Sequence, residues 1–258
     1  MANDTVLDLI IDIGNTRAKL LAMSHGEVVE ETTCDSETLD ALDGLVRRQS
    51  FSRGIVSTVG KVGERAWNAL RQLDFPVIRL TPATPLPIAT VFPESMGSDR
   101  IAAIVGAMYL KPGAPLLIAD AGTCVTYEFI DDEGTYLGGN IAPGLRLRML
   151  AMHEHTALLP LVEVKGEVPE IGYDTETAMR AGAVLGLKHE IEGYIRAYRE
   201  QHPRLQVFLT GGDEFQFGPD IQPIIQANHH LVPLGLWRIL SCNLPEPKEQ
   251  EQNTTKEI

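Results

Sequence analysis

The chain has 258 residues, a length that suits two lobes with a hydrophobic core each. It is 44% hydrophobic and 22% charged, as soluble globular proteins are, and its formal net charge of −13 argues against non-specific binding to nucleic acid or anionic lipid. No apolar run reaches the length of a membrane span, and the start of the chain lacks a basic region followed by an apolar one. We therefore expect a cytoplasmic protein with neither a nucleic acid nor a membrane as partner.

Three cysteines, Cys34, Cys124 and Cys242, are spread along the chain without Cys-x-x-Cys spacing. Their spacing indicates neither a zinc site nor a disulfide framework. Cys124 lies in an apolar segment, so we expect its side chain to be buried in the core.

The first informative segment is the apolar stretch around Asp12, which predicts a central strand that turns at Gly14 and continues as a second strand. A carboxylate in such a strand is costly to bury unless it faces a cation or a polar cleft. Gly14 lets backbone amides approach a polyanion, Asn15 and Thr16 can form hydrogen bonds, and Lys19 adds a positive charge. The pattern predicts a phosphate-binding turn, although a single copy fits an ordinary hairpin turn equally well.

The first part of the chain alternates strands and helices, which indicates an α/β lobe. Residues 6–33 form the predicted β-hairpin, with its turn at Gly26. We expect a helix over 38–49, a strand over 54–59, a helix over 64–73, an extended Pro-rich connector over 81–93 and an apolar helix over 101–108.

The start of the apolar helix carries Ser98, Asp99 and Arg100. Ser98 or Asp99 stands where an N-cap belongs, which gives Asp99 a structural explanation. An Asp-Arg pair at the start of a buried helix can also hold a base and an anion receptor on rigid backbone. The residues alone leave both interpretations open.

A second segment repeats the first pattern: an apolar strand leads to Asp120 and Gly122, and another strand follows. Asp12 and Asp120 are 108 positions apart (120 − 12 = 108), and so are the turn glycines Gly26 and Gly134 (134 − 26 = 108). Chance rarely keeps a whole hairpin in step, so we infer a duplicated domain. The predicted fold is α/β, with two duplicated ribonuclease-H-like lobes and a nucleotide cleft between them, as in the actin-like ATPase superfamily.

The rest of the chain is predicted to hold a helix over 145–155, with Arg146 and Arg148 in solvent, and a long helix capped by Asp174 or Thr175. The small residues at its start favour a helix–helix contact, and we expect its apolar stripe over 187–198 to cover a neighbouring subunit as well as its own lobe. A strand over 205–209 then ends at Gly211-Gly212-Asp213, either an adenine and ribose wall or a left-handed turn.

Taken together, these motifs resemble the type III pantothenate kinase family, whose members phosphorylate pantothenate with ATP at the first step of coenzyme A synthesis. The resemblance rests on motifs that occur in the family's order: Asp12-Ile13-Gly14-Asn15-Thr16, Gly97-Ser98-Asp99-Arg100, Asp120-Ala121-Gly122-Thr123, Pro143-Gly144, Asp174-Thr175 with Ala178-Met179, and Gly211-Gly212-Asp213. It implies lobes over 1–115 and 116–245, and we expect a disordered tail over 246–258 because its composition lacks apolar periodicity.

The resemblance also assigns roles to residues. It implies ATP binding by Asp12, Gly14, Asn15, Thr16, Arg17, Lys19, Gly122 and Thr123, and substrate binding by Gly97, Ser98, Asp99, Arg100 and Thr175. Asp99 takes the role of the catalytic base, and Asp120 that of the monovalent-cation ligand. Asp12 would hold magnesium, directly or through water.

The family further implies a homodimer with its pantothenate pocket near the subunit interface, and a requirement for magnesium and for potassium or ammonium. This chain departs from the family pattern at two positions. Thr90 replaces a common Tyr of the pocket wall, where Phe92 could compensate, and Asp174 replaces the commoner Asn before Thr175.

Two other functions remain open from the residues. One is another small-molecule kinase of the same superfamily, against which only the segment 97–100 argues. The other is a non-catalytic, nucleotide-dependent regulator. An intact Asp99 and two intact turns favour an enzyme, and the net acidity disfavours direct DNA binding.

Overall fold

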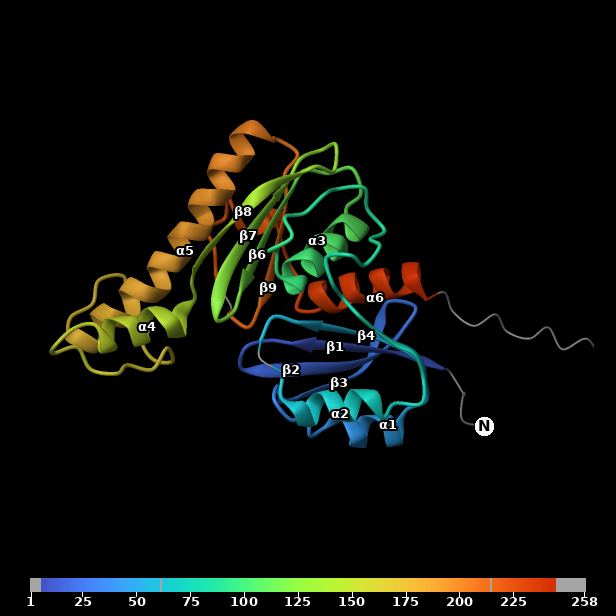
Figure 1. Cartoon of the computed structure of the whole chain (residues 1–258). Coiled ribbons are helices and arrows are strands. Elements are labelled where there is room, and N and C mark those ends of the chain that lie inside the picture. The colour runs from blue at the N-terminus through green and yellow to red at the C-terminus, as the bar shows by residue number, and fades with distance from the viewer. Residues whose placement is uncertain (1–5, 61, 214, 245–258) are drawn as a thin grey trace, which may run out of the picture. The chain divides into compact units, whose positions relative to one another are not determined.

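The computed structural model describes residues 6–60, 62–213 and 215–244 (Figure 1). These residues divide into two compact units: unit 1 comprises the described residues of 1–87 and 236–258, and unit 2 comprises those of 88–235. The predicted disordered tail, 246–258, lies outside the described residues. Within the described part, no helix is both long and apolar enough to cross a membrane.

Unit 1 contains a five-stranded mixed sheet in the order β3-β2-β1-β4-β5. Strands β1, β2 and β3 are antiparallel neighbours, whereas β4 is parallel to β1, and β5 to β4. Every residue of β1 except Asp12 is buried, which confirms the predicted central strand. The elements are β1 (Leu7–Ile13), β2 (Arg17–Ser24), β3 (Glu27–Asp35), α1 (Leu42–Arg48), β4 (Phe51–Thr58), α2 (Glu64–Arg71) and β5 (Val77–Arg79).

The two faces of this sheet are packed differently. On one face, Leu9, Ile11 and Ile13 of β1 form a core with side chains of α1 and α2. The other face buries a charged pair, in which Arg53 of β4 donates to both carboxylate oxygens of Asp8 at 2.7 and 2.8 Å. Because a buried ion pair is stable only when its remaining hydrogen-bonding groups are satisfied, further donors such as Trp237 matter here; its indole nitrogen donates to Asp8 at 2.9 Å.

Unit 2 contains a second five-stranded sheet in the order β10-β9-β6-β7-β8. Read from β8, this is the strand order of the first sheet, with the same parallel and antiparallel pairs. The predicted duplication is therefore confirmed. The elements from residue 98 onward are α3 (Ser98–Leu110), β6 (Leu116–Ala121), β7 (Cys124–Ile130), β8 (Tyr136–Pro143), α4 (Leu145–Glu154), α5 (Thr175–Gln201), β9 (Gln206–Gly211), the 3-10 helix η1 (Gln222–Ile224), β10 (Ile225–Ala227) and α6 (Leu231–Asn243).

The helices that follow the fifth strand of each repeat do not keep to their own repeat. Helix α3 follows β5 in sequence but belongs to unit 2, while the end of α6, which follows β10, belongs to unit 1. Within unit 2, α3 and the start of α6 meet so closely that a Cβ on Gly235 would lie 1.8 Å from the Ala102 carbonyl oxygen. The bounds of the compact units thus differ from those of the lobes expected over 1–115 and 116–245. The expected bounds, which mark where the two repeats join, stay a prediction.

The apolar stripe of α5 lies in the core of its own unit. Leu187, Ile191, Ile195 and Tyr198 are at most 8% exposed and pack with buried side chains of β6, β7 and β9. The expectation that this stripe also covers a neighbouring subunit was wrong, because the sheet of unit 2 already buries it.

Candidate active site

The first hairpin turn, between β1 and β2, presents an exposed polar edge. Gly14 donates its N–H to the carbonyl oxygen of Arg17 at 3.0 Å, and the three residues after Gly14 are exposed. The backbone of Gly60 supports the turn from behind, since a Cβ on Gly60 would lie 2.6 Å from the Gly14 carbonyl oxygen. Asp12 is directly across from Lys19, so the first carboxylate has a cationic cross-strand neighbour.

The second turn, between β6 and β7, is one residue shorter. Gly122 donates to the carbonyl oxygen of Cys124 at 3.0 Å, two residues ahead, and both Gly122 and Thr123 are exposed. Gly144 packs against this turn so closely that a Cβ would lie 2.1 Å from the Gly122 carbonyl oxygen. Cys124 is exposed rather than buried, so the packing prediction was wrong; it is the first residue of β7, next to the open turn.

In the second sheet, Asp120 occupies the position that Asp12 has in the first sheet. The parallel neighbour of each aspartate is a buried hydroxyl residue, Ser57 for Asp12 and Thr210 for Asp120. The antiparallel neighbour differs, because Thr126 stands across from Asp120. The second carboxylate therefore has a neutral cross-strand neighbour where the first has a lysine.

Asp99 lies in the first turn of α3, but it is not the N-cap. That position belongs to Gly97, without any side-chain cap, so the capping prediction for Ser98 or Asp99 was wrong. Oδ1 of Asp99 accepts a hydrogen bond from the backbone N–H of Arg100 at 2.7 Å. Burial raises the pKa of the Asp99 carboxyl above its ordinary value, against the lowering effect of Arg100.

Arg100 is engaged by two residues that the sequence analysis missed, Glu128 and Tyr136. Its Nε and Nη2 donate to the two oxygens of Glu128 at 2.5 and 2.9 Å, and the Tyr136 hydroxyl donates to Glu128 Oε2 at 2.8 Å. Burial raises the pKa of Glu128, while its hydrogen bond raises the pKa of Arg100. A carboxylate in an otherwise apolar strand requires a cationic partner, and that signal could have drawn attention to Glu128.

The surroundings hold this pair in place. Gly139 of β8 lies so close that a Cβ would be 2.4 Å from Glu128 Oε2 and 2.6 Å from Arg100 Nη2. Thr90, one of the departures from the family pattern, accepts a hydrogen bond from the backbone N–H of Tyr136 at 3.0 Å. Phe92 packs on the same tyrosine, with 5.3 Å between ring centroids. Thr90 and Phe92 therefore both contact Tyr136, which helps to hold the partner of Arg100.

Asp174 caps α5, as predicted, in a capping box with Thr177. Its oxygen accepts from the backbone N–H of Thr177 at 2.8 Å, and hydrogen bonds from that residue lower the pKa of Asp174. The other departure from the family pattern therefore serves the helix start. Thr175 is exposed immediately after it.

Two further predictions concern Arg148 and the segment from Gly211 to Asp213. Arg148 is not free in solvent as expected, because its Nη2 pairs with Glu190 of α5 at 2.5 Å. Gly211 has the left-handed conformation, with φ of +95°, and Asp213 accepts a hydrogen bond from the backbone N–H of Leu145 at the start of α4. These contacts give Asp213 a structural role in unit 2.

The carboxylates of the two turns are compatible with cations whose coordination is completed by a bound phosphate. Among the described residues, no three His, Cys, Asp or Glu side chains gather to hold a metal. Magnesium keeps several waters and commonly binds one or two carboxylates together with substrate phosphates, so single carboxylates such as Asp12 and Asp120 fit that chemistry.

Comparison with known sequences decides the family. The sequence profile of the family described as type III pantothenate kinase matches residues 8–197, a span that includes both turns, Asp99 and Thr175. The chain belongs to the type III pantothenate kinase family. Type III pantothenate kinases from Phocaeicola vulgatus and Bacteroides fragilis are 47% and 45% identical to it over 239 residues, covering 92% of this chain and 99% and 98% of theirs. One from Porphyromonas gingivalis is 38% identical over 241 residues, 92% of this chain and 99% of its own.

Solved structures support the fold of this type III pantothenate kinase family member. A Campylobacter jejuni protein named for the Baf family of transcriptional activators has a TM-score of 0.59 at 21% identity, covering 91% of this chain and 98% of its own. A Sinorhizobium meliloti protein named for 2-dehydro-3-deoxygalactonokinase has a TM-score of 0.56 at 14% identity, covering 94% and 99%. The predicted family, enzyme class and two-lobe α/β fold are confirmed, whereas the roles of individual residues stay predictions.

Proposed function

We propose that the chain transfers the γ-phosphate of ATP to pantothenate, forming 4′-phosphopantothenate in the first step of coenzyme A synthesis, with Asp99 as the base. Membership of the family supports the reaction. The observation that carries the role of Asp99 is a partly buried carboxyl with a raised pKa, held in the first turn of α3 without serving as its cap. A base must be ionised at the working pH of the enzyme to accept a proton, and a raised pKa makes its carboxylate a stronger base.

The chemistry asks mainly for positioning and for charge neutralisation. In phosphoryl transfer the protein has little covalent work to do, so groups that orient the acceptor hydroxyl and stabilise the γ-phosphate dominate. Asp99 would accept the proton of the pantothenate hydroxyl as that oxygen attacks phosphorus. Gly97 and Ser98 would fix the substrate against the start of α3, and Thr175 would contact it from the start of α5.

Arg100 would meet the substrate with only part of its guanidinium group. The edge formed by Nε and Nη2 is occupied by Glu128, so a bidentate contact with the pantothenate carboxylate through that edge would require breaking a buried ion pair. We therefore assign Arg100 a single-donor contact through Nη1. Glu128 and Tyr136 act as positioning residues for it.

For the nucleotide, we propose ATP-binding roles for residues of each turn. Gly14, Asn15, Thr16, Arg17 and Lys19 offer amides, hydroxyl and cations to the phosphates, and Gly122 and Thr123 add donors from the second turn. Magnesium, bound through Asp12, would neutralise phosphate charge. Asp120 would hold potassium or ammonium, since a neutral Thr126 across the strand leaves room for an external cation.

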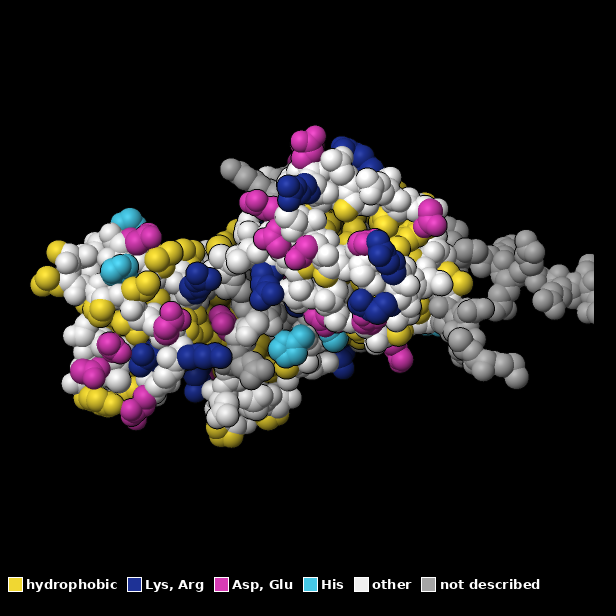
Figure 2. Space-filling model, turned by 90° about the horizontal axis from the view of Figure 1, so that it is seen from below, with side chains coloured by type: hydrophobic (Ala, Val, Ile, Leu, Met, Phe, Trp, Pro, Cys, Tyr) yellow, Lys and Arg dark blue, Asp and Glu magenta, His cyan; other side chains and the backbone are white. Residues whose placement is uncertain are grey.

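We also propose a homodimer, built on the region around α4 and the start of α5. Exposed apolar side chains gather there, as Figure 2 shows at the end of the molecule that carries α4. Leu158 is 91% exposed, and Leu161, Ile171 and Tyr173 are each at least 60% exposed. Sedimentation at micromolar concentration tests this proposal; a monomer with full specific activity would rule it out. The cytoplasmic location stays a prediction.

An ADP-release assay distinguishes the proposed reaction from its alternatives. Pantothenate, simple sugars and acetate are compared as acceptors, with potassium present and absent. Of the three acceptors, only pantothenate is expected to give turnover. Turnover with a sugar and none with pantothenate would favour another small-molecule kinase, and ATP binding without turnover would favour a regulator.

A further inference from the structure

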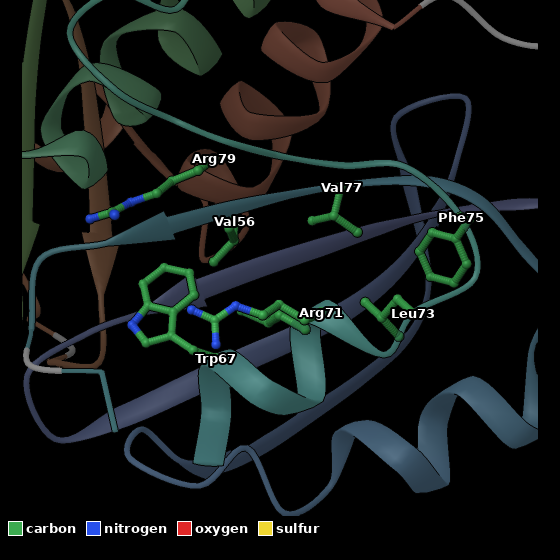
Figure 3. Close-up of a pocket in the computed structure, with 8 residues that line it drawn as sticks. Val56, Trp67, Arg71, Leu73, Phe75, Val77 and Arg79 are labelled. Carbon is green, nitrogen blue, oxygen red and sulfur yellow. The ribbon is translucent and has the colours of Figure 1, made fainter. Parts of the chain in front are cut away.

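A groove with a volume of about 640 Å³ lies on unit 1 between α2 and strands β4 and β5, of which β5 is the edge strand (Figure 3). Among its lining residues, all within the described part of the chain, two are arginines and none is acidic. The lining residues are Val56, Trp67, Leu70, Arg71, Leu73, Phe75, Val77 and Arg79.

The groove is lined by side chains of α2, of the edge strand β5 and of the segment between them. Strand β5 has three residues and ends the sheet, and α2 has eight residues. As a result, Trp67, Leu73, Phe75 and Val77 pack against the core of unit 1 but remain partly exposed. Covering such apolar surface is favourable for any ligand that fits.

Charge and apolar surface are separated along the groove. The guanidinium carbon of Arg79 lies 5.0 Å from the centroid of the Trp67 ring, and Arg71 points toward the same ring in Figure 3. Leu73 and Phe75 lie at the opposite end. One end therefore offers two cationic groups beside an aromatic ring, and the other offers only apolar side chains.

The neighbouring surface has the opposite charge. A smaller groove of about 390 Å³ shares Leu73 with the first and is lined by the acidic residues Asp43 and Asp74. In a chain with a net charge of −13, an anion is repelled by the surface in general. The end of the groove at Arg71 and Arg79 is thus a local exception that an anion can recognise.

We propose that this groove binds a small amphipathic carboxylate, with its acid group at Arg71 and Arg79 and its acyl or aryl body over Trp67 toward Phe75. Its volume falls in the range of roughly 300–1,000 Å³ that is typical of small-molecule sites. An apolar ligand body gains from the floor, and the carboxylate selects the arginine end. The inference uses no residue of the proposed active site and does not depend on the proposed reaction.

The first test compares three ligands of equal chain length by calorimetric titration of the full chain: octanoate, octanol and octylammonium. Octanoate is expected to bind, octanol to bind at least tenfold more weakly, and octylammonium not to bind. Added salt should weaken octanoate binding, because the arginines are exposed and their charges are screened. Equal binding of all three ligands would overturn the proposal, since it would show apolar contact alone.

The second test uses Arg71→Gln and Arg79→Gln, which remove charge and keep much of the side-chain length. Each is expected to weaken octanoate binding about tenfold, and both together about a hundredfold. Arg65→Gln is the matched control, because Arg65 is exposed on α2 outside the groove; its affinity and melting temperature should equal those of the wild type. Unchanged affinity in the double variant would overturn the proposal. So would dissociation of a wild-type assembly by octanoate, which would make the groove an interface with a second copy.

Discussion

The two Asp-x-Gly hairpins lie in sheets of the same strand order and differ in charge. In each, the aspartate lies beside a buried hydroxyl residue of the parallel strand, yet Lys19 stands across from Asp12 and neutral Thr126 across from Asp120. Two positions earlier in each first strand, the pattern reverses: Ile10 faces buried Leu21, whereas Ile118 faces Glu128. The two copies therefore keep the same strand pairing while the charged residues at matching positions differ.

The helices that follow the fifth strands extend this contrast. Helix α3 has Asp99 in its first turn, whereas α6, its counterpart in the second repeat, has no acidic residue there. The proposed base therefore occurs once, although the scaffold occurs twice. If the unmatched residues carry the chemistry, changing them should alter catalysis.

The largest effect is expected for Asp99→Asn. The variant keeps the acceptor for the Arg100 amide but cannot take a proton, so kcat should fall by about 10²–10⁴ while ATP still binds. Steady-state kinetics and nucleotide titration measure both quantities.

The melting temperature of Asp99→Asn shows whether Asp99 acts as a base or only stabilises the fold. The pKa of Asp99 is raised in the folded chain, so its stabilising contribution belongs to the protonated form and is lost as the pH rises through that pKa. At neutral pH the ionised carboxylate therefore costs stability, and Asp99→Asn should melt at the same or a higher temperature. Lower stability with an unchanged rate would show a structural residue instead.

The next effect concerns Glu128, the acid without a counterpart in β2. Glu128→Gln leaves Arg100 without its buried counter-charge, which should lower the free energy of unfolding by about 3 kcal/mol. If Glu128 positions Arg100, the KM for pantothenate should rise more than that for ATP. Glu133→Gln, in the exposed turn after β7, is the matched control. Loss of stability with both KM values unchanged would reduce Glu128 to a structural role.

A third prediction makes the second hairpin resemble the first. Thr126→Lys places a cation across from Asp120, as Lys19 stands across from Asp12. Wild-type activity should drop when sodium replaces potassium at constant ionic strength, and the variant should reduce that potassium-to-sodium ratio about tenfold, because the lysine replaces the bound cation. Thr126→Gln controls for side-chain size. Equal wild-type rates in both salts would refute the assignment of Asp120.

The sequence predicts the parts of this molecule that depend on local pattern. Both hairpins, the repeated sheet and the Asp174 cap follow from apolar runs, turn glycines and short-range hydrogen bonding. Contacts between distant segments were missed, because no local pattern specifies them. Arg100 and Glu128 are 28 positions apart and come from a helix and a strand, so the sequence offered only the cost of burying Glu128 as a signal. The placement of α3 in unit 2 and of the end of α6 in unit 1 also depends on packing between distant segments, which no local pattern specifies.

The smallest expected effect is a shift in the pH profile. Asp99 must be ionised to act as a base, so kcat/KM should fall as the pH is lowered through its pKa, which burial raises above the ordinary value of 3.8. The charge of Arg100 lowers that pKa, and Glu128 neutralises much of this charge. In Glu128→Gln, Arg100 should therefore stabilise the Asp99 carboxylate more, moving the acid limb down by less than about one pH unit. A limb that does not move, measured beside Glu133→Gln, would separate Glu128 from the electrostatics of the base; a limb that moves would link the unmatched acid of β7 to the unmatched acid of α3.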